Sequence, residues 1–321
     1  MTVRILVGDV RAMLATLPDE SVHCVVTSPP YWGLRDYGVE GQIGLEATPG
    51  EFIDTMTEVF REVRRVLRAD GTLWLNIGDS YTGSASTGGA GKETAYTGKR
   101  TLPNKRADGL KPKDLVGMPW RLAFALQADG WWLRQDIIWS KPNPMPESVR
   151  DRCTKAHEYI FLLSKSERYY FDAEAISEPV ESGPSDIKKM LEQKERIGGK
   201  HKVLVDPLSM ASSTTNIGQK RSVGDGESRN KRSVWTITTK GFSEAHFATF
   251  PPELPELCIR AGCPPGGTVL DPFFGAGTTG LVADRLGRDC IGIELNPAYA
   301  EMARRRIEGD APLLSTVSCS A

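Results

Sequence analysis

The sequence lacks the features of membrane and secreted proteins. No run of apolar residues approaches the roughly 18 that a membrane-spanning helix needs. The N-terminus, Met1 to Asp9, has the pattern of a strand that runs into an acidic turn. It has no charged start, apolar middle and small-residue cleavage site of the kind found in a signal peptide. We therefore expect a cytoplasmic protein without a membrane partner.

Cysteine and histidine are too few and too scattered to predict a metal site. The chain has six cysteines and four histidines, with no C-x-x-C pair and no histidine pair beside one. Structural zinc sites need such closely spaced ligands. We expect free, mostly buried thiols and no bound metal.

The whole chain has no excess of positive or negative charge, but two of its segments do. The chain has 40 basic and 41 acidic residues, yet residues 82–113 and residues 186–233 each carry a net charge of +5. Two basic segments attached to an acidic body are typical of loops that touch a polyanion. Solvated linkers would have the same composition, so both interpretations stay open.

Predicted strands and helices alternate along the chain. With 321 residues, of which 40% are hydrophobic, the chain can bury a substantial core. The alternation predicts an α/β fold with a parallel sheet covered on both faces. Residues 81–113 are predicted as a mobile loop and residues 186–233 as an inserted module. The predicted strands are 3–7, 22–27, 72–77, 131–140, 159–164, 268–270 and 290–293, and the predicted helices are 10–17, 50–67, 118–128, 252–261, 279–286 and 298–307.

A glycine turn follows the predicted strand 268–270 in the string TVLDPFFGAGTTG, and Glu294 ends the next strand. Glycines let the backbone approach a nucleoside cofactor, and an acid about 20 residues further on can accept the ribose hydroxyls. A P-loop is missing, because Gly91-Lys92 is followed by Glu93. Asp271-Pro272-Phe273 before the turn and Thr278-Thr279 at the start of the helix favour a smaller ligand such as S-adenosylmethionine.

The string TSPPYW, residues 27–32, follows the apolar strand 22–26 without a break. Prolines commonly end strands and aromatics commonly cover strand ends, so the string has an ordinary structural explanation. Its position at the carboxyl end of a parallel strand is also where such sheets bind ligands.

Taken together, these motifs resemble the amino-group DNA methyltransferases of the beta arrangement, in which the catalytic motif precedes the cofactor motif. The blocks that resemble the family occur in the expected order: LVGDVRAMLATLPDESVHCVVTSPPYWGLRDYG, GTLWLNIGDSY, LRQDIIWSKPNPMPES, HEYIFLLSKSERYYFD, HFATFPPEL, DPFFGAGTTG and IGIELN. The resemblance implies a Rossmann-like S-adenosylmethionine-dependent methyltransferase fold, circularly permuted, with an inserted target-recognition region. It places the catalytic part in residues 1–180, target recognition in 181–240 and the cofactor-binding part in 241–321.

The resemblance also implies roles for single residues. The catalytic residues would be Ser28, Pro29, Pro30 and Tyr31. Arg35, Asp36, Trp139, Lys141 and Asn143 would flank the base pocket, although a structural role suits each of them equally. The cofactor would be S-adenosylmethionine, bound by Asp9, His246, Phe250, Asp271, Phe273, Gly275, Gly277, Thr278 and Glu294. A helix cap is the alternative for Asp9, and an ordinary buried histidine for His246.

The implied reaction is direct methyl transfer to an exocyclic base amine. Ser28 Oγ and the Pro29 carbonyl can accept the amine N–H bonds, and Tyr31 can stack on a base flipped out of the duplex. Methylation of cytosine carbon 5 would need a cysteine after a proline, and no cysteine in the chain follows one.

The substrate predicted from this resemblance is cytosine N4 in duplex DNA. Within the family, serine at the first motif position accompanies cytosine N4 more often, and aspartate accompanies adenine N6. Adenine N6 stays open, as do an RNA or protein amide nitrogen and a DNA-binding regulator without turnover. The resemblance also allows a homodimer and a cognate restriction endonuclease.

Overall fold

The computed structural model describes residues 1–34, 38–82, 109–179, 228–239, 249–310 and 316–320. Its contacts divide the chain into two compact units. The first comprises Met1–Asp172 and Arg232–Ala321, and the second comprises Ala173–Lys231. None of the helices in the described part of the chain has the length and apolar character needed to cross a bilayer.

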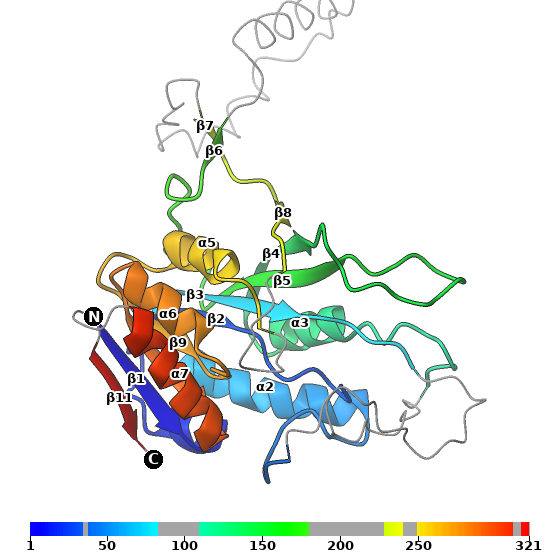
Figure 1. Cartoon of the computed structure of the whole chain (residues 1–321), viewed down its shortest axis with the longest axis horizontal. Helices are drawn as coiled ribbons and strands as arrows, with labels where there is room; N and C mark the ends of the chain where they lie inside the picture. The colour runs from blue at the N-terminus through cyan, green and yellow to red at the C-terminus, as the bar shows by residue number, and fades with distance from the viewer. Residues whose placement is uncertain (35–37, 83–108, 180–227, 240–248, 311–315, 321) are drawn as a thin grey trace, which may run out of the picture. The chain divides into compact units, whose positions relative to one another are not determined.

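The first unit is built around a sheet to which the described residues contribute nine strands (Figure 1). Their order across the sheet is β11-β1-β10-β9-β2-β3-β5-β4-β8. The strands are β1 (Thr2–Val7), β2 (Val22–Thr27), β3 (Leu67–Ile77), β4 (Trp132–Ser140), β5 (His157–Ser164), β8 (Val234–Thr236), β9 (Thr268–Asp271), β10 (Asp289–Glu294) and β11 (Thr316–Ser320).

The prediction of a parallel sheet is wrong for one strand. β5 runs antiparallel to both of its neighbours, β3 and β4, whereas the other pairs of this sheet are parallel. The reason lies in the connection between β4 and β5, residues 141–156, which contains no helix. A parallel pair needs a crossover, usually helical, so this direct connection produces a hairpin. The edge strands β8 and β11, which are short, were not predicted.

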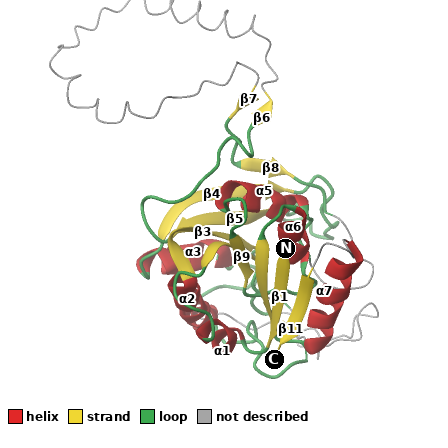
Figure 2. Ribbon diagram, turned by 90° about the vertical axis from the view of Figure 1, so that its left-hand side faces the viewer, coloured by secondary structure: helices red, strands yellow, loops and turns green. Residues whose placement is uncertain are grey.

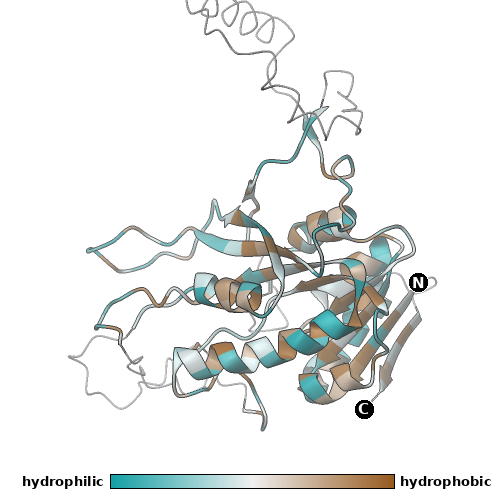
Figure 3. Cartoon of the chain, turned by 180° about the vertical axis from the view of Figure 1, so that it is seen from behind, coloured by the Kyte–Doolittle hydropathy of each residue, from teal (hydrophilic) through white to brown (hydrophobic). Residues whose placement is uncertain are grey.

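Of the helices in the described residues, three lie on each face of the sheet (Figures 1 and 2). α1 (Val10–Ala15), α2 (Pro49–Val66) and α3 (Met118–Ala128) pack on one face, and α5 (Glu253–Gly262), α6 (Thr278–Arg285) and α7 (Pro297–Asp310) on the other. α2 begins with a capping box formed by Thr48 and Glu51, and its apolar stripe from Phe52 to Val66 is fully buried. The apolar colouring of the strands between these helices marks the core (Figure 3).

The second unit is described only at its ends. β6 (Glu178–Pro179) pairs antiparallel with β7 (Ser228–Arg229). Glu178 forms ion pairs with Arg229 at 3.0 Å and with Lys231 at 3.9 Å. Most of the predicted target-recognition region, 181–240, and most of the predicted loop, 81–113, lie outside the described residues, so both stay predictions.

One edge of the sheet collects the residues that the sequence singled out. β1, β10, β9 and β2 are parallel neighbours, so their carboxyl ends meet at this edge and carry Asp9, Glu294, Asp271 and Ser28. Because β5 is antiparallel, its first residues arrive at the same edge.

Candidate functional site

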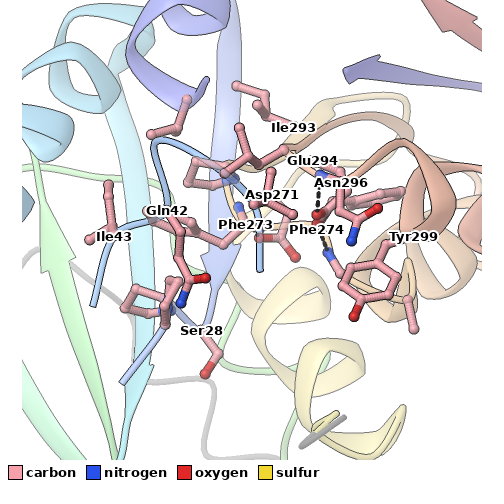
Figure 4. Close-up of a pocket in the computed structure, with 18 of the residues that line it drawn as sticks. Ser28, Gln42, Ile43, Asp271, Phe273, Phe274, Ile293, Glu294, Asn296 and Tyr299 are labelled. Atoms are coloured by element: carbon pink, nitrogen blue, oxygen red, sulfur yellow. Dashed lines mark hydrogen bonds between the residues drawn. The ribbon is translucent and has the colours of Figure 1, made fainter. Parts of the chain in front are cut away.

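A pocket at this edge is lined by both ends of the chain (Figure 4). Eleven of the thirteen predicted catalytic and cofactor residues line it: Asp9, Ser28, Pro29, Pro30, Tyr31, Phe250, Asp271, Phe273, Gly275, Thr278 and Glu294. Of the other two, Gly277 lies in the same turn without lining the pocket, and His246 lies outside the described residues. Arg35 and Asp36 also lie outside them.

Asp271 lies at the centre of the pocket wall and is only 1% exposed. Thr27 Oγ1 donates to its Oδ1 at 2.7 Å, Phe273 N donates to the same oxygen at 3.1 Å, and Thr279 Oγ1 donates to Oδ2 at 2.7 Å. Burial raises the pKa of Asp271 to about 6, against the opposing effect of these three hydrogen bonds. The carboxyl group therefore joins β2, the turn and α6.

Glu294 ends β10 on the opposite side of the glycine turn. Gly275 N donates to its Oε2 at 2.8 Å and Asn296 N donates to Oε1 at 2.9 Å, the bonds drawn in Figure 4. Burial raises the pKa of Glu294 above its ordinary value. Each oxygen of a carboxylate can accept a second hydrogen bond, so Glu294 can still accept two hydroxyl groups.

The two glycines of the turn have different reasons to be glycine. Both have the left-handed conformation, with φ of 51° at Gly275 and 73° at Gly277. A Cβ on Gly277 would lie 2.8 Å from Cβ of Ala303 on α7, whereas a Cβ on Gly275 would meet nothing within 4 Å. Gly277 thus allows α7 to pack closely, and Gly275 leaves open space beside the Glu294 carboxylate.

Asp9 caps α1, as the alternative explanation expected. Its Oδ1 accepts hydrogen bonds from Arg11 N at 3.0 Å and from Ala12 N at 3.2 Å, and Arg11 forms an ion pair with it. Asp9 still lines the pocket. A capping role and a pocket position are therefore combined in this residue.

The string TSPPYW divides into buried and pocket-facing residues. Thr27 is fully buried and bonds Asp271, whereas Ser28 to Tyr31 line the pocket. Trp32 is 7% exposed and belongs to the core, where its Nε1 donates to the Glu46 carbonyl at 3.0 Å. The first and last residues of the string thus hold the four between them in place.

Three of the flanking residues have structural contacts. Trp139 Nε1 donates to the Ile237 carbonyl at 2.9 Å, and Asn143 exchanges hydrogen bonds with the backbone of Thr239. Lys141 forms an ion pair with Glu158. The contacts of Trp139 and Asn143 fasten the end of β4 to the segment that follows β8, and the Lys141 ion pair fastens it to the start of β5.

Sequence reasoning missed several residues of the pocket wall. Gln42 and Ile43 lie on the side of Ser28, whereas Asn296 and Tyr299 lie beyond Glu294 (Figure 4). Residues 38–46 contain no periodic pattern that would have placed Gln42 and Ile43. Asn296 had a usable signal, because an Asn before a Pro is a common helix start, and its Oδ1 caps α7 by accepting from Ala298 N.

The geometry defines a class of protein. A strand, a glycine turn and a helix, followed by an acid at the end of the next strand, form a nucleoside-cofactor site in an α/β sheet. The residues fit S-adenosylmethionine, because Glu294 offers free acceptors beside an open glycine backbone and Ile43, Phe273 and Ile293 add apolar walls. The fold and site are those of an α/β enzyme that uses such a cofactor.

Comparisons with known proteins name the family. Residues 22–305 match the model of the N6/N4 methyltransferases, described as DNA methylase. The chain is 49% identical to Type II methyltransferase M.SmaI of Serratia marcescens, over 95% of this chain and 90% of the relative. It is 46% identical to M.Cfr9I of Citrobacter freundii, over 94% and 87%. The chain therefore belongs to the N6/N4 family of DNA methylases, and it is a DNA methyltransferase.

Solved structures agree with this family. A protein of Thermus thermophilus, described as a candidate DNA modification methylase and complexed with S-adenosyl-L-methionine, is 26% identical with a TM-score of 0.58 and covers 99% of each chain. The PvuII DNA methyltransferase (cytosine-N4-specific) has a TM-score of 0.61 at 20% identity, over 94% of this chain and 85% of that one, which supports the fold. The methyl donor of this enzyme is S-adenosylmethionine, and its permuted Rossmann-like fold is that of the family.

Proposed function

We propose that this enzyme transfers the methyl group of S-adenosylmethionine to the exocyclic N4 amine of cytosine in duplex DNA, at a specific site. The observation that carries the proposal is the shared pocket, in which Ser28 faces the same space as Gly275 and Glu294. An amine held by Ser28 would lie next to a cofactor held by the glycine turn. The serine at the first motif position, as in the N4-cytosine members that the sequence resembles, supports cytosine as the base.

In this proposal Ser28 Oγ and the Pro29 carbonyl accept the N–H bonds of the amine. The two prolines restrict the backbone, so the acceptors are already oriented before the base arrives. The nitrogen lone pair, otherwise delocalised into the ring, becomes more available when its protons are held this way. Asp9, Phe250, Asp271, Phe273, Gly275, Gly277, Thr278 and Glu294 form the cofactor side, with Glu294 as acceptor for the ribose hydroxyls and His246 as a further candidate.

The DNA would be bound by the basic segments, and the target base would be flipped into the pocket against Tyr31. Residues 181–240 would supply target recognition. Action within a restriction–modification system, with a cognate endonuclease, is supported by the Type II designation of the relatives. A homodimer and a cytoplasmic location complete the proposal.

The test is to incubate the protein with labelled S-adenosylmethionine and unmodified DNA, digest the DNA to nucleosides and identify the methylated nucleoside by mass. N4-methylcytosine is expected. Detection of N6-methyladenine would identify adenine, and not cytosine, as the target base. An absence of label in DNA would favour a regulator without turnover.

Ser28→Ala should reduce transfer by at least about 100-fold while cofactor affinity stays unchanged, because the hydroxyl contacts the amine and not the cofactor. Ser21→Ala is the matched control, since Ser21 donates only to the Pro18 carbonyl at 2.7 Å, away from the pocket. Equal turnover of the wild type and Ser28→Ala would contradict the assignment of Ser28.

A further inference from the structure

A short chain of polar groups leads from the pocket to a partly buried carboxylate on β5. The Tyr31 hydroxyl donates to Glu158 Oε2 at 2.9 Å, and the Ser28 side chain, three residues earlier in the same pocket wall, lies close enough to this hydroxyl to lower the pKa of Tyr31. Ser28 and Tyr31 line the pocket, whereas Glu158 lies behind them with 16% of its side chain exposed. A group bound at Ser28 is therefore two hydroxyls away from an acid that does not line the pocket.

Both oxygens of Glu158 accept hydrogen bonds from side chains, one of which also balances the negative charge. Lys141 Nζ donates to Oε1, and Asn76 Nδ2 donates to Oε2 at 3.3 Å. Lys141 is 17% exposed and lies 4.2 Å above the ring of Trp139. Moving such a pair out of water costs free energy, so the pair is weak evidence for stability alone. Its position directly behind the pocket suggests a chemical use.

The tyrosine is held in the orientation that proton movement needs. A Cβ on Gly78 would lie 2.6 Å from Cε2 of Tyr31, so the ring is pressed against the backbone there. Burial, and then the charge of Glu158, raise the pKa of Tyr31 well above its ordinary value, so the phenol keeps its proton. The Ser28 contact acts in the opposite direction, as a hydroxyl that donates to the phenol oxygen would.

We propose that Glu158 is the final acceptor of the proton that the target amine loses, and that the proton reaches it through the hydroxyls of Ser28 and Tyr31. The inference rests on the proposed role of Ser28 as acceptor of the amine N–H. Glu158 acts through Tyr31 and is therefore a positioning residue that also stores the proton.

Bonds, charges and protons balance in the transfer step. The amine nitrogen forms a bond to the methyl carbon, and the carbon–sulfur bond breaks with its electron pair staying on sulfur. The nitrogen then carries an extra proton, which passes to Ser28 Oγ while the serine proton passes to Tyr31 Oη and the tyrosine proton to Glu158. The products are a neutral methylated amine, a neutral thioether and a protonated Glu158, which later releases its proton to solvent.

This relay explains how a serine can stand in place of a carboxylate that would accept the amine proton directly. A serine hydroxyl is too weak a base at neutral pH to keep a proton, so it needs a stronger acceptor behind it. β5 supplies that acceptor because its antiparallel direction brings its first residues to the pocket edge, where Trp139 of β4 pairs with Glu158.

The test measures single-turnover methyl transfer to unmodified phage DNA, with protein in excess and saturating S-adenosylmethionine. Glu158→Gln and Tyr31→Phe should each slow transfer about 100-fold. The double variant should be no slower than the slower single variant, because the two groups act as one unit. Glu62→Gln is the control, since Glu62 also pairs with a cation, Arg65 at 2.8 Å on α2, and should leave the rate unchanged.

The pH profile separates a relay from a merely structural role. Among the described residues, Lys141 and Lys155 are the charged groups that face Glu158, and Tyr31 and Asn76 are its neutral neighbours. All four remain in Glu158→Gln. In that variant the proton must leave to solvent, so its rate relative to wild type should rise with pH. Cofactor affinity, measured by calorimetry, should be unchanged.

Rates of Glu158→Gln and Tyr31→Phe within twofold of wild type would overturn the inference and leave the proposed function intact. Additive losses without a changed pH profile would also overturn it, in favour of a structural role. Adenine methylated by the wild type would correct the proposed base and leave the relay in place. No methylation by the wild type would overturn both.

Discussion

Replacing Asp271 by Asn should remove a pH-dependent loss of stability from the protein without cofactor. Asp271 is 1% exposed and accepts three hydrogen bonds, yet burial still raises its pKa from an ordinary 3.8 to about 6. The folded state therefore binds a proton more tightly at this site than the unfolded chain does. Asn has nearly the same shape but does not titrate, so it isolates this effect.

The magnitude follows from the two pKa values. Each pKa step corresponds to 1.36 kcal/mol, so a change from 3.8 to about 6 corresponds to about 3 kcal/mol. Below pH 3.8 the carboxyl group is protonated in both states. Between 3.8 and about 6 the unfolded chain has lost the proton while the folded protein keeps it, so the free energy of unfolding falls as pH rises. Above about 6 the full loss is present.

The assay is urea unfolding of wild type and Asp271→Asn between pH 4 and 7.5. The difference in unfolding free energy, wild type minus variant, should decrease by up to about 3 kcal/mol across this range. Other titrating groups are common to both proteins and largely cancel. Asp54→Asn, at an exposed position of α2, is the control and should give a constant difference. A difference for Asp271→Asn that stays flat, or that increases with pH, would refute the reasoning.

Two further predictions concern packing and cofactor binding. Gly292→Ala should destabilise the protein by about 1–3 kcal/mol, because the added Cβ would lie 2.3 Å from the buried Phe274 ring. A thermal melt measures this loss. Gly309→Ala is the control and should not lower the melting temperature, because a Cβ added there would have no atom within 4 Å. Glu294→Ala should raise the Kd for S-adenosylmethionine about 10–100-fold in calorimetry, since hydrogen bonds to a charged group contribute about 1.5–3 kcal/mol. An unchanged Kd would exclude contact between Glu294 and the cofactor.

Local patterns predicted the elements that carry the strongest signals. The strand Val22–Thr27 and the helix Met118–Ala128 begin and end where the sequence predicted. The continuous apolar run indicates a buried strand, and the helical spacing of apolar residues indicates a helix. The direction of β5 depended on the connection 141–156, whose three prolines were interpreted only as a turn. The edge strands are short and mixed in polarity, so nothing in their composition marks them.

The pocket could be predicted only where its residues belong to continuous motifs. Ser28 to Tyr31 and the turn around Gly275 are such motifs, and the sheet order brings them to one edge. The hydrogen bond between Tyr31 and Glu158 joins residues 127 positions apart, so only the folded structure reveals it. The burial of Trp32 could not be predicted from the sequence, because it depends on the loop that covers the end of the strand. Here that loop accepts a hydrogen bond from Trp32 through the Glu46 carbonyl.

The bond between Thr27 and Asp271 has a consequence for synthesis of the chain. β2 lies between β3, which is made soon after it, and β9, which is made about 240 residues later. At about 5–20 residues per second, a ribosome leaves one edge of this apolar strand without its partner for roughly 12–50 s. During that interval β2 exposes unpaired backbone groups along one edge, which is the kind of edge to which another chain can pair.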